Sequence, residues 1–238
     1  IIGYIVVFLL NLTMLKGSLR CEPFLFLRYK YLFLANNIFK FKHEFFSVFI
    51  EPKNYMEAQF KTIAELFHNT VEKYSNKELY YYKKGHDWSS INGKTILYTV
   101  TDIGNALLSF NLQKGDKVGI ISANSPKWAM ADYGIICSGC ATVSIYPTLI
   151  PSQIEYILRD SGLKVLFLEN EDQLEKINQI WANCESLKTV VMLNDSFDQE
   201  SDKIVKFSTF LDFGMKYSND NPKAFEKASS SIKENDLL

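Results

Sequence analysis

Histidine and cysteine are scarce in this chain of 238 residues, which contains three histidines and four cysteines. The histidines lie outside the segments that we expect to form the main sheet, so a histidine-based catalytic triad has no good candidate. Cys137 and Cys140 have the spacing of a metal or redox pair, but no second pair completes a four-ligand zinc site. We therefore interpret the cysteines as buried packing residues, because free cysteine is often buried, and not as a disulfide scaffold.

Short motifs that identify common enzyme classes are also absent. No strand is followed by Gly-x-Gly-x-x-Gly, so the sequence gives little support for a dinucleotide-binding site. There is no Gly-x-Ser-x-Gly of a hydrolase elbow. The net charge of −1 argues against nucleic acid as the main partner. The apolar run at residues 1–15 is shorter than the roughly 20 residues that a membrane-spanning helix needs.

The most regular pattern in the chain occupies residues 112–161 and alternates strand, helix, strand, helix. We expect strands at 117–123 and 141–145, and helices at 126–138 and from 151 onward. Ser125 is suited to cap the first helix, and Pro126 fits its first position, where no donor is lost. Gly139 is expected to end that helix in a left-handed conformation.

Similar patterns extend on both sides of this stretch. The expected elements are a helix at 62–74 that begins with a capping box, a hairpin of strands 79–83 and 88–91, helices at 101–112, 171–181 and 207–215, and strands at 164–168 and 189–193. Residues 219–235 are polar and are expected to form an exposed loop. Four strands that alternate with helices predict an α/β fold, with a Rossmann-like parallel sheet and flanking helices.

Many residues of the central stretch also occur in an order that is known from one family. They are Gly115, Asp116, Asn124, Pro126, Trp128, Asp132, Gly139, Ala141, Tyr146, Thr148, Leu149, Ile154, Tyr156, Leu158 and Ser161. This order resembles the N-terminal part of acyl-CoA synthetases of the adenylate-forming (AMP-binding) superfamily, and most of all the long-chain fatty-acid–CoA ligases. The resemblance covers about residues 62–238. Two positions depart from it: Lys127 replaces a usual Glu, and Ser144 replaces a frequent Pro.

The resemblance implies a role in fatty acid metabolism. Full-length members use ATP, Mg2+ and CoA to convert a long-chain fatty acid into an acyl-adenylate and then a thioester. Their phosphate loop reads approximately Thr-Ser-Gly-Thr-Thr-Gly-x-Pro-Lys, and no such segment occurs in this sequence. Residues 232–238 resemble the lead-in to that loop. We therefore expect an incomplete large domain with no catalytic, cofactor-binding or metal-binding residue, which binds no cofactor and is inactive as an isolated fragment.

The segment before Met56 differs in composition from the rest and divides the chain into regions 1–55 and 56–238. It is apolar and rich in aromatics, with seven basic residues against three acidic ones. Aromatic rings and lysines favour the headgroup region of a membrane, which predicts association with the endoplasmic reticulum or another cytosol-facing membrane. The alternatives are a cleaved targeting segment, an arm packed on the body, or translation that starts at Met56, with a cytoplasmic protein as the result.

Two other functions remain open at this stage. The chain is interpreted alternatively as a non-catalytic, membrane-associated binding module from a truncated gene, or as part of a different acyl- or aryl-CoA ligase of the same superfamily. Fatty-acid binding without ATP dependence would favour the binding module. The acyl pocket, which lies downstream in the family, would separate the ligases.

Overall fold

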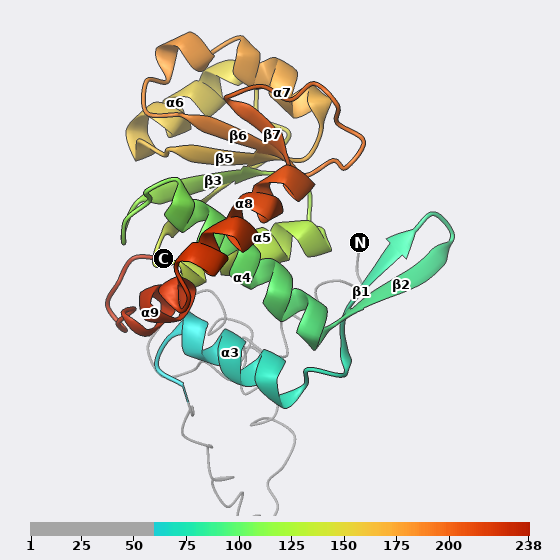
Figure 1. Ribbon diagram of the computed structural model, residues 1–238. Helices are drawn as coiled ribbons and strands as arrows, with labels where there is room; N and C mark the ends of the chain where they lie inside the picture. The colour runs from blue at the N-terminus through green and yellow to red at the C-terminus, as the bar shows by residue number, and fades with distance from the viewer. Residues whose placement is uncertain (1–59) are drawn as a thin grey trace, which may run out of the picture. The chain divides into compact units, whose positions relative to one another are not determined.

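A five-stranded parallel sheet organises the computed structural model, which describes residues 60–238 (Figure 1). The strand order is β4-β3-β5-β6-β7. The strands are β3 (Lys117–Ile121), β4 (Ala141–Ile145), β5 (Val165–Leu168), β6 (Thr189–Met192) and β7 (Ile204–Lys206). This confirms the predicted α/β class and parallel sheet, and adds β7, which the sequence did not predict. The expectations for residues 1–55, including the start at Met56, lie outside the described residues.

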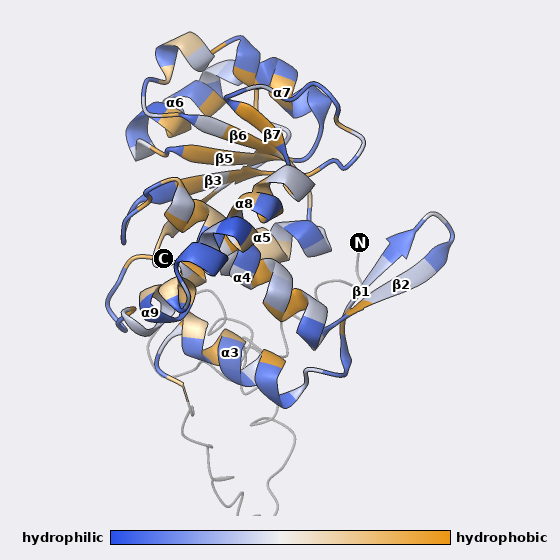
Figure 2. Ribbon diagram, in the orientation of Figure 1, coloured by the Kyte–Doolittle hydropathy of each residue, from blue (hydrophilic) through white to orange (hydrophobic). Residues whose placement is uncertain are grey.

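Helices cover both faces of the sheet (Figure 1). One face packs against α4 (Gly93–Ser109), α5 (Pro126–Cys137) and α8 (Phe207–Asp220), with α3 (Ile63–Lys73) and α9 (Ala224–Ser230) contributing to the same core. The other packs against α6 (Pro151–Ser161), α7 (Glu171–Asn178) and the 3-10 helix η1 (Trp181–Asn183). Figure 2 shows the strands as strongly hydrophobic, as expected for a sheet buried on both sides.

The central stretch folds as its turn residues predict. The Ser125 side-chain oxygen accepts a hydrogen bond from the Trp128 N–H at 3.1 Å, which caps α5. Gly139 has φ of +82° after this helix, and Gly162 has φ of +64° after α6. Both glycines therefore end their helices in the left-handed region, where a side chain would be strained.

The helix predicted at 101–112 was placed too late, because α4 begins at Gly93. Asn92 caps it, with its side-chain oxygen accepting from the Thr95 N–H at 2.9 Å. Close packing requires a glycine at position 93, since a Cβ there would lie 2.7 Å from the Tyr74 carbonyl oxygen. The helix thus starts at Gly93, directly after the hairpin of β1 (Glu78–Lys84) and β2 (Asp87–Asn92).

The C-terminal prediction was wrong in part. Helix α8 is longer than the expected 207–215, and residues 219–235 contain α9 instead of an exposed loop. Phe225 is 4% exposed and Ile232 is 7% exposed, and both belong to the hydrophobic core that α4 and α5 form with the sheet. The sparse apolar residues of this segment are thus sufficient to anchor it, although its overall composition is polar.

Candidate functional site at the carboxyl edge of the sheet

The carboxyl ends of the five parallel strands meet at one edge of the sheet. From β3 the chain passes to β4 on one side and then returns to β5 on the other side of β3. The point between β3 and β5 is therefore a topological switch point, the usual place for a ligand in an open α/β sheet. The loops that follow β3, β5 and β6 lie around this position.

A carboxylate joins the loops after β3 and β5 at the switch point. The Ala123 N–H, just after β3, donates to Glu169 Oε2 at 2.9 Å. In the neighbouring loops, the Asn194 amide donates to both carboxylate oxygens of Glu171, at 3.1 and 3.0 Å. The loops after β3, β5 and β6 are thus joined through side chains at an acidic edge.

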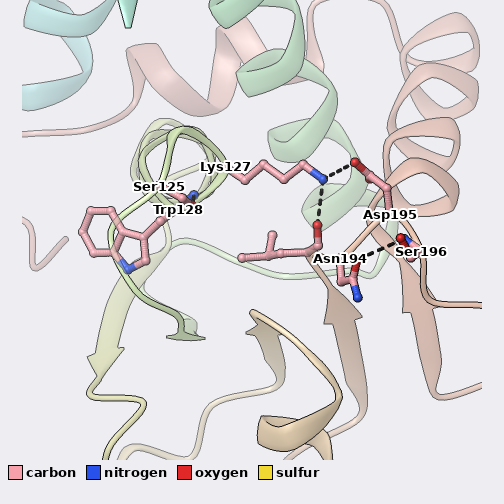
Figure 3. Close-up of polar contacts among 7 residues, drawn as sticks. Ser125, Lys127, Trp128, Asn194, Asp195 and Ser196 are labelled. Atoms are coloured by element: carbon pink, nitrogen blue, oxygen red, sulfur yellow. Dashed lines mark hydrogen bonds and ion pairs between the residues drawn. The ribbon is translucent and has the colours of Figure 1, made fainter. Parts of the chain in front are cut away.

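Lys127, one of the two residues that depart from the family pattern, connects three elements at this edge, and its bonds to the loop after β6 are drawn in Figure 3. Its Nζ donates to the Leu193 carbonyl oxygen at 2.7 Å and to Asp195 Oδ2 at 2.5 Å. It also lies 5.2 Å from the centroid of the Phe207 ring, at the start of α8. Lys127 therefore ties the start of α5 to the loop after β6, and Asp195 supplies the charge that matches a lysine here.

The opposite, amino edge holds several of the residues that carried the family resemblance. The Gly115 N–H donates to the Gly139 carbonyl oxygen, and the Ala141 N–H to that of Asp116, both at 2.8 Å. The Asp116 carboxylate accepts from the Gln113 N–H at 2.8 Å and from Lys164 Nζ at 2.7 Å.

Partial burial disfavours the charged form of Asp116, but the Gln113 N–H and the Lys164 ammonium outweigh it and lower the pKa of this carboxyl. These matched positions therefore hold the turns that start β3 and β4. Their role in the described residues is structural.

The two central cysteines are packing residues, as predicted. Cys137 and Cys140 are fully buried. Burial, helped by the nearby Asp132 carboxylate, raises the pKa of the Cys137 thiol to about 12. Burial also raises the pKa of Cys140. A thiol that stays protonated is a poor nucleophile and metal ligand. Within residues 60–238, no three His, Cys, Asp or Glu side chains are grouped so as to hold a metal ion.

A contact that the sequence did not predict joins α3 to α9. His68 Nε2 lies 2.9 Å from Ser229 Oγ, and the two residues are 161 positions apart in the chain. Burial lowers the pKa of His68, although Glu226 and Glu72 oppose this shift. His68 also borders a pocket of about 370 Å³ together with Val71, Glu72, Ser75, Lys94, Leu97 and Tyr98. Ser229 itself is 8% exposed, so the pair is suited to fix the two helices and not to attack a substrate.

Solved structures of adenylate-forming ligases share this fold. An anthranilate CoA ligase, AuaEII, in complex with anthranoyl-AMP superposes with a TM-score of 0.55 and 23% identity, over 63% of this chain and 27% of that one. The A-PCP didomain of a carboxylic acid reductase from Segniliparus rugosus, in complex with AMP, gives the same TM-score at 10% identity, over 63% of this chain and 26% of that one. At these identities the similarity concerns the fold.

Residues 67–237 match the family model described as AMP-binding enzyme, and the chain belongs to this family. Among curated proteins, it is 25% identical over 153 residues to the rat long-chain-fatty-acid–CoA ligase ACSBG1, covering 64% of this chain and 21% of the relative. It is 28% identical over 154 residues to rat ACSBG2, covering 64% and 23%. The chain thus spans about a fifth of the length of the curated relatives that it matches. The predicted absence of catalytic, cofactor-binding and metal-binding residues stays a prediction.

Proposed function

We propose that this chain supplies the N-terminal part of a long-chain fatty-acid–CoA ligase. In such a ligase a fatty acid and ATP form an acyl-adenylate, and the acyl group then passes to CoA. The family match over residues 67–237 carries the proposal, and the names of the relatives ACSBG1 and ACSBG2, both long-chain-fatty-acid–CoA ligases, support the substrate class.

In this proposal the described residues position the site and do not react. The sheet fixes the loops at its carboxyl edge, where Lys127 and Glu169 bond to neighbouring loops. The carboxylates of Glu169 and Glu171 repel phosphate, and Lys127 at the same edge is already paired with Asp195, so the groups that bind ATP would come from other segments. For the same reason, Mg2+ and the nucleotide are assigned to the complete family enzyme and to no residue of this chain.

We further propose that the 238-residue polypeptide alone does not form acyl-adenylates. Its sequence contains no Gly/Ser/Thr loop that ends in Pro-Lys, and such a loop holds the phosphates through backbone N–H groups and hydroxyls. The check is an AMP-release assay with the purified 238-residue chain, a long-chain fatty acid, ATP, Mg2+ and CoA. Turnover above that of a heat-treated sample would contradict this part of the proposal.

The decisive experiment is to sequence the transcript across both ends of this reading frame and to express whatever frame it defines. We expect the product to convert long-chain fatty acids and CoA to acyl-CoA with release of AMP. A product that binds fatty acid without ATP dependence and forms no thioester would favour the binding module. Preference for short or aryl carboxylates would assign the chain to another ligase of the superfamily.

We also propose that the protein associates with a cytosol-facing membrane such as the endoplasmic reticulum. The aromatic and basic composition of residues 1–55 supports this localisation. Among the described residues, no helix is both long and apolar enough to cross a membrane. Cell fractionation tests the proposal, and release of the protein from membranes by high salt would indicate electrostatic attachment. Recovery in the cytosolic fraction at low salt would contradict it.

A further inference from the structure

The β1–β2 hairpin has one face that packs on the body and one that faces away from it. The strand register pairs Lys83 with Trp88 and Tyr81 with Ser90, so these four side chains share one face. Tyr80 lies on the opposite face and packs against the main core. The outer face of the hairpin, defined here as Tyr81, Lys83, Trp88 and Ser90, exposes 58% of Tyr81 and 62% of Trp88.

Lysine and aromatic side chains lie together on this outer face and again at the base of the hairpin. Lys83 Nζ is 5.7 Å from the centroid of the Trp88 ring. Lys94 lies equally far from the centroid of the exposed Tyr98 ring at the start of α4. Two further lysines of the same region, Lys73 and Lys77, lie over Tyr74 at 5.3 and 5.8 Å. Four of the five cation–π contacts in the described residues therefore belong to residues 73–98.

This region also differs in charge from the rest of the described domain. Residues 72–98 carry five lysines and three carboxylates, whereas the other residues of 60–238 carry fourteen basic and twenty acidic side chains. The hairpin extends from the helices (Figure 1), and in Figure 2 it lacks the strong hydrophobic colour of the main sheet. Its composition is thus amphipathic, with aromatic rings beside positive charge.

We propose that the outer face of the hairpin, with Lys84 at its tip, docks on a membrane surface that contains anionic lipid. Indole and phenol rings favour the headgroup level because one end is apolar and the other polar. Lysine is attracted to the negative surface potential of such membranes. Residues 72–98, which include the hairpin, carry a net charge of +2, and this excess favours an anionic partner over another copy of the domain, whose other described residues are mainly acidic. The inference goes beyond the proposed ligase activity and does not depend on it.

A single-tryptophan version of the full 238-residue chain tests this contact directly. The sequence contains three tryptophans, so the double variant Trp128→Phe and Trp181→Phe leaves Trp88 as the only indole. The fluorescence emission of Trp88 is recorded with phosphatidylcholine vesicles that contain or lack phosphatidylserine. Lipids with brominated acyl chains serve as the quencher. We expect a blue shift and quenching with the anionic vesicles only, since Trp88 then leaves water for the headgroup region.

Charge variants of the natural sequence provide a second measurement that does not require tryptophan replacement. Lys83→Glu with Lys84→Glu should weaken binding to anionic vesicles at least fivefold per lysine, as about 1 kcal/mol per charge implies. Lys216→Glu with Lys227→Glu, on exposed positions of α8 and α9, is the matched control and should change binding less.

The possible results separate this inference from its rivals. Vesicle binding with unchanged Trp88 emission, or equal losses in the two charge variants, would assign the contact to other residues such as 1–55 and overturn the proposal. A blue shift that depends on protein concentration without lipid would indicate contact with a second copy and overturn it as well. Neither result bears on thioester formation, so the proposed ligase function is tested separately.

Discussion

The two faces of the parallel sheet are covered in different ways. The face under α6 and α7 is covered by consecutive crossover helices, and its core residues lie between Ile121 and Phe197. The face under α4, α5 and α8 gathers core residues from Ala64 to Ile232. The first face is therefore built from one continuous segment, whereas the second requires segments from both ends of the described chain.

The second face also depends on close approach between helices. A Cβ at Gly134 of α5 would lie 2.4 Å from Ile103 of α4, and a Cβ at Gly214 of α8 would lie 1.9 Å from the Asp102 carbonyl oxygen. Such spacing tolerates little added volume, because protein interiors are close-packed. The carboxyl edge is connected to this face, since Lys127 of α5 lies over Phe207 of α8. We expect substitutions in the α4–α5–α8 face to have the larger effects.

Removing the ring that closes this face should have the largest effect. Phe225 of α9 is 4% exposed and lies against Gly104 and His68. Phe225→Ala should lower the free energy of unfolding by about 3–5 kcal/mol, because it removes a buried ring and leaves a cavity. Urea unfolding followed by circular dichroism measures the change. The control is Phe213→Ala on α8, which is 38% exposed and should lose much less; equal losses would show that α9 contributes little to the core.

Adding a single methyl group at the α4–α8 contact tests the close approach itself. In Gly214→Ala the new Cβ would overlap the backbone of Asp102, so the two helices must separate. We expect a loss of about 2–3 kcal/mol, in the range of overpacked cores. Met215→Ala, at the neighbouring position with 44% exposure, should change stability by less than about 0.5 kcal/mol. A Gly214→Ala protein as stable as the natural one would mean that α4 and α8 can separate at little cost in free energy.

The same difference between the faces explains what the sequence could predict. The segment 112–193 was predicted well because its caps, glycine turns and apolar strand runs are local signals, as at Ser125 and Gly139. One exception is the helix expected at 171–181, which ends at Asn178 and is followed by the separate 3-10 helix η1. Helix α9 was missed because the burial of Phe225 depends on α3 and α4, which lie more than a hundred residues earlier. No local pattern reports such a contact.

The candidate site shows the same limit. The sequence marked Lys127 as a departure from the family, but its partner Asp195 lies 68 residues further along the chain. The two side chains meet only because β3, β5 and β6 lie side by side in the sheet, which places the loops after β3 and β6 at the same edge. Likewise, Asp116 was noted as a family position, whereas its bond to Lys164 required the fold. The sequence therefore singled out Lys127 and Asp116, but it did not predict the side chains to which they bond.

The pH dependence of the free energy of unfolding tests the α4–α8 contact without a change in packed volume. Burial, with a contribution from Asp212 on α8, raises the pKa of Asp102 to about 6. The folded state thus holds this proton more tightly than the unfolded state, whose carboxyl titrates near 4. The stabilisation that this proton provides is present below about pH 4 and is lost as pH rises through about 6.

Asp102→Asn should remove this pH dependence, with an effect below about 1 kcal/mol because the group is half exposed. Stability measured at several pH values for both proteins provides the check, and Asp220→Asn at the exposed end of α8 is the control. A natural protein whose unfolding free energy follows that of Asp102→Asn throughout this range would contradict the assignment.

The smallest energy that we expect to resolve is the coupling between Lys127 and Asp195 at the carboxyl edge, where a charge exchange can separate pairing from packing. Lys127→Glu places a carboxylate beside Asp195 and removes the bond to the Leu193 carbonyl, so it should cost about 1 kcal/mol. Adding Asp195→Lys should restore part of this loss through the reversed pair, although the carbonyl bond stays absent. A double-mutant cycle in urea measures the coupling, which we expect at about 0.5 kcal/mol because Asp195 is 69% exposed. Zero coupling would mean that Lys127 stabilises the fold through the Leu193 carbonyl and the Phe207 ring alone, and that the ion pair with Asp195 contributes nothing to the free energy of unfolding.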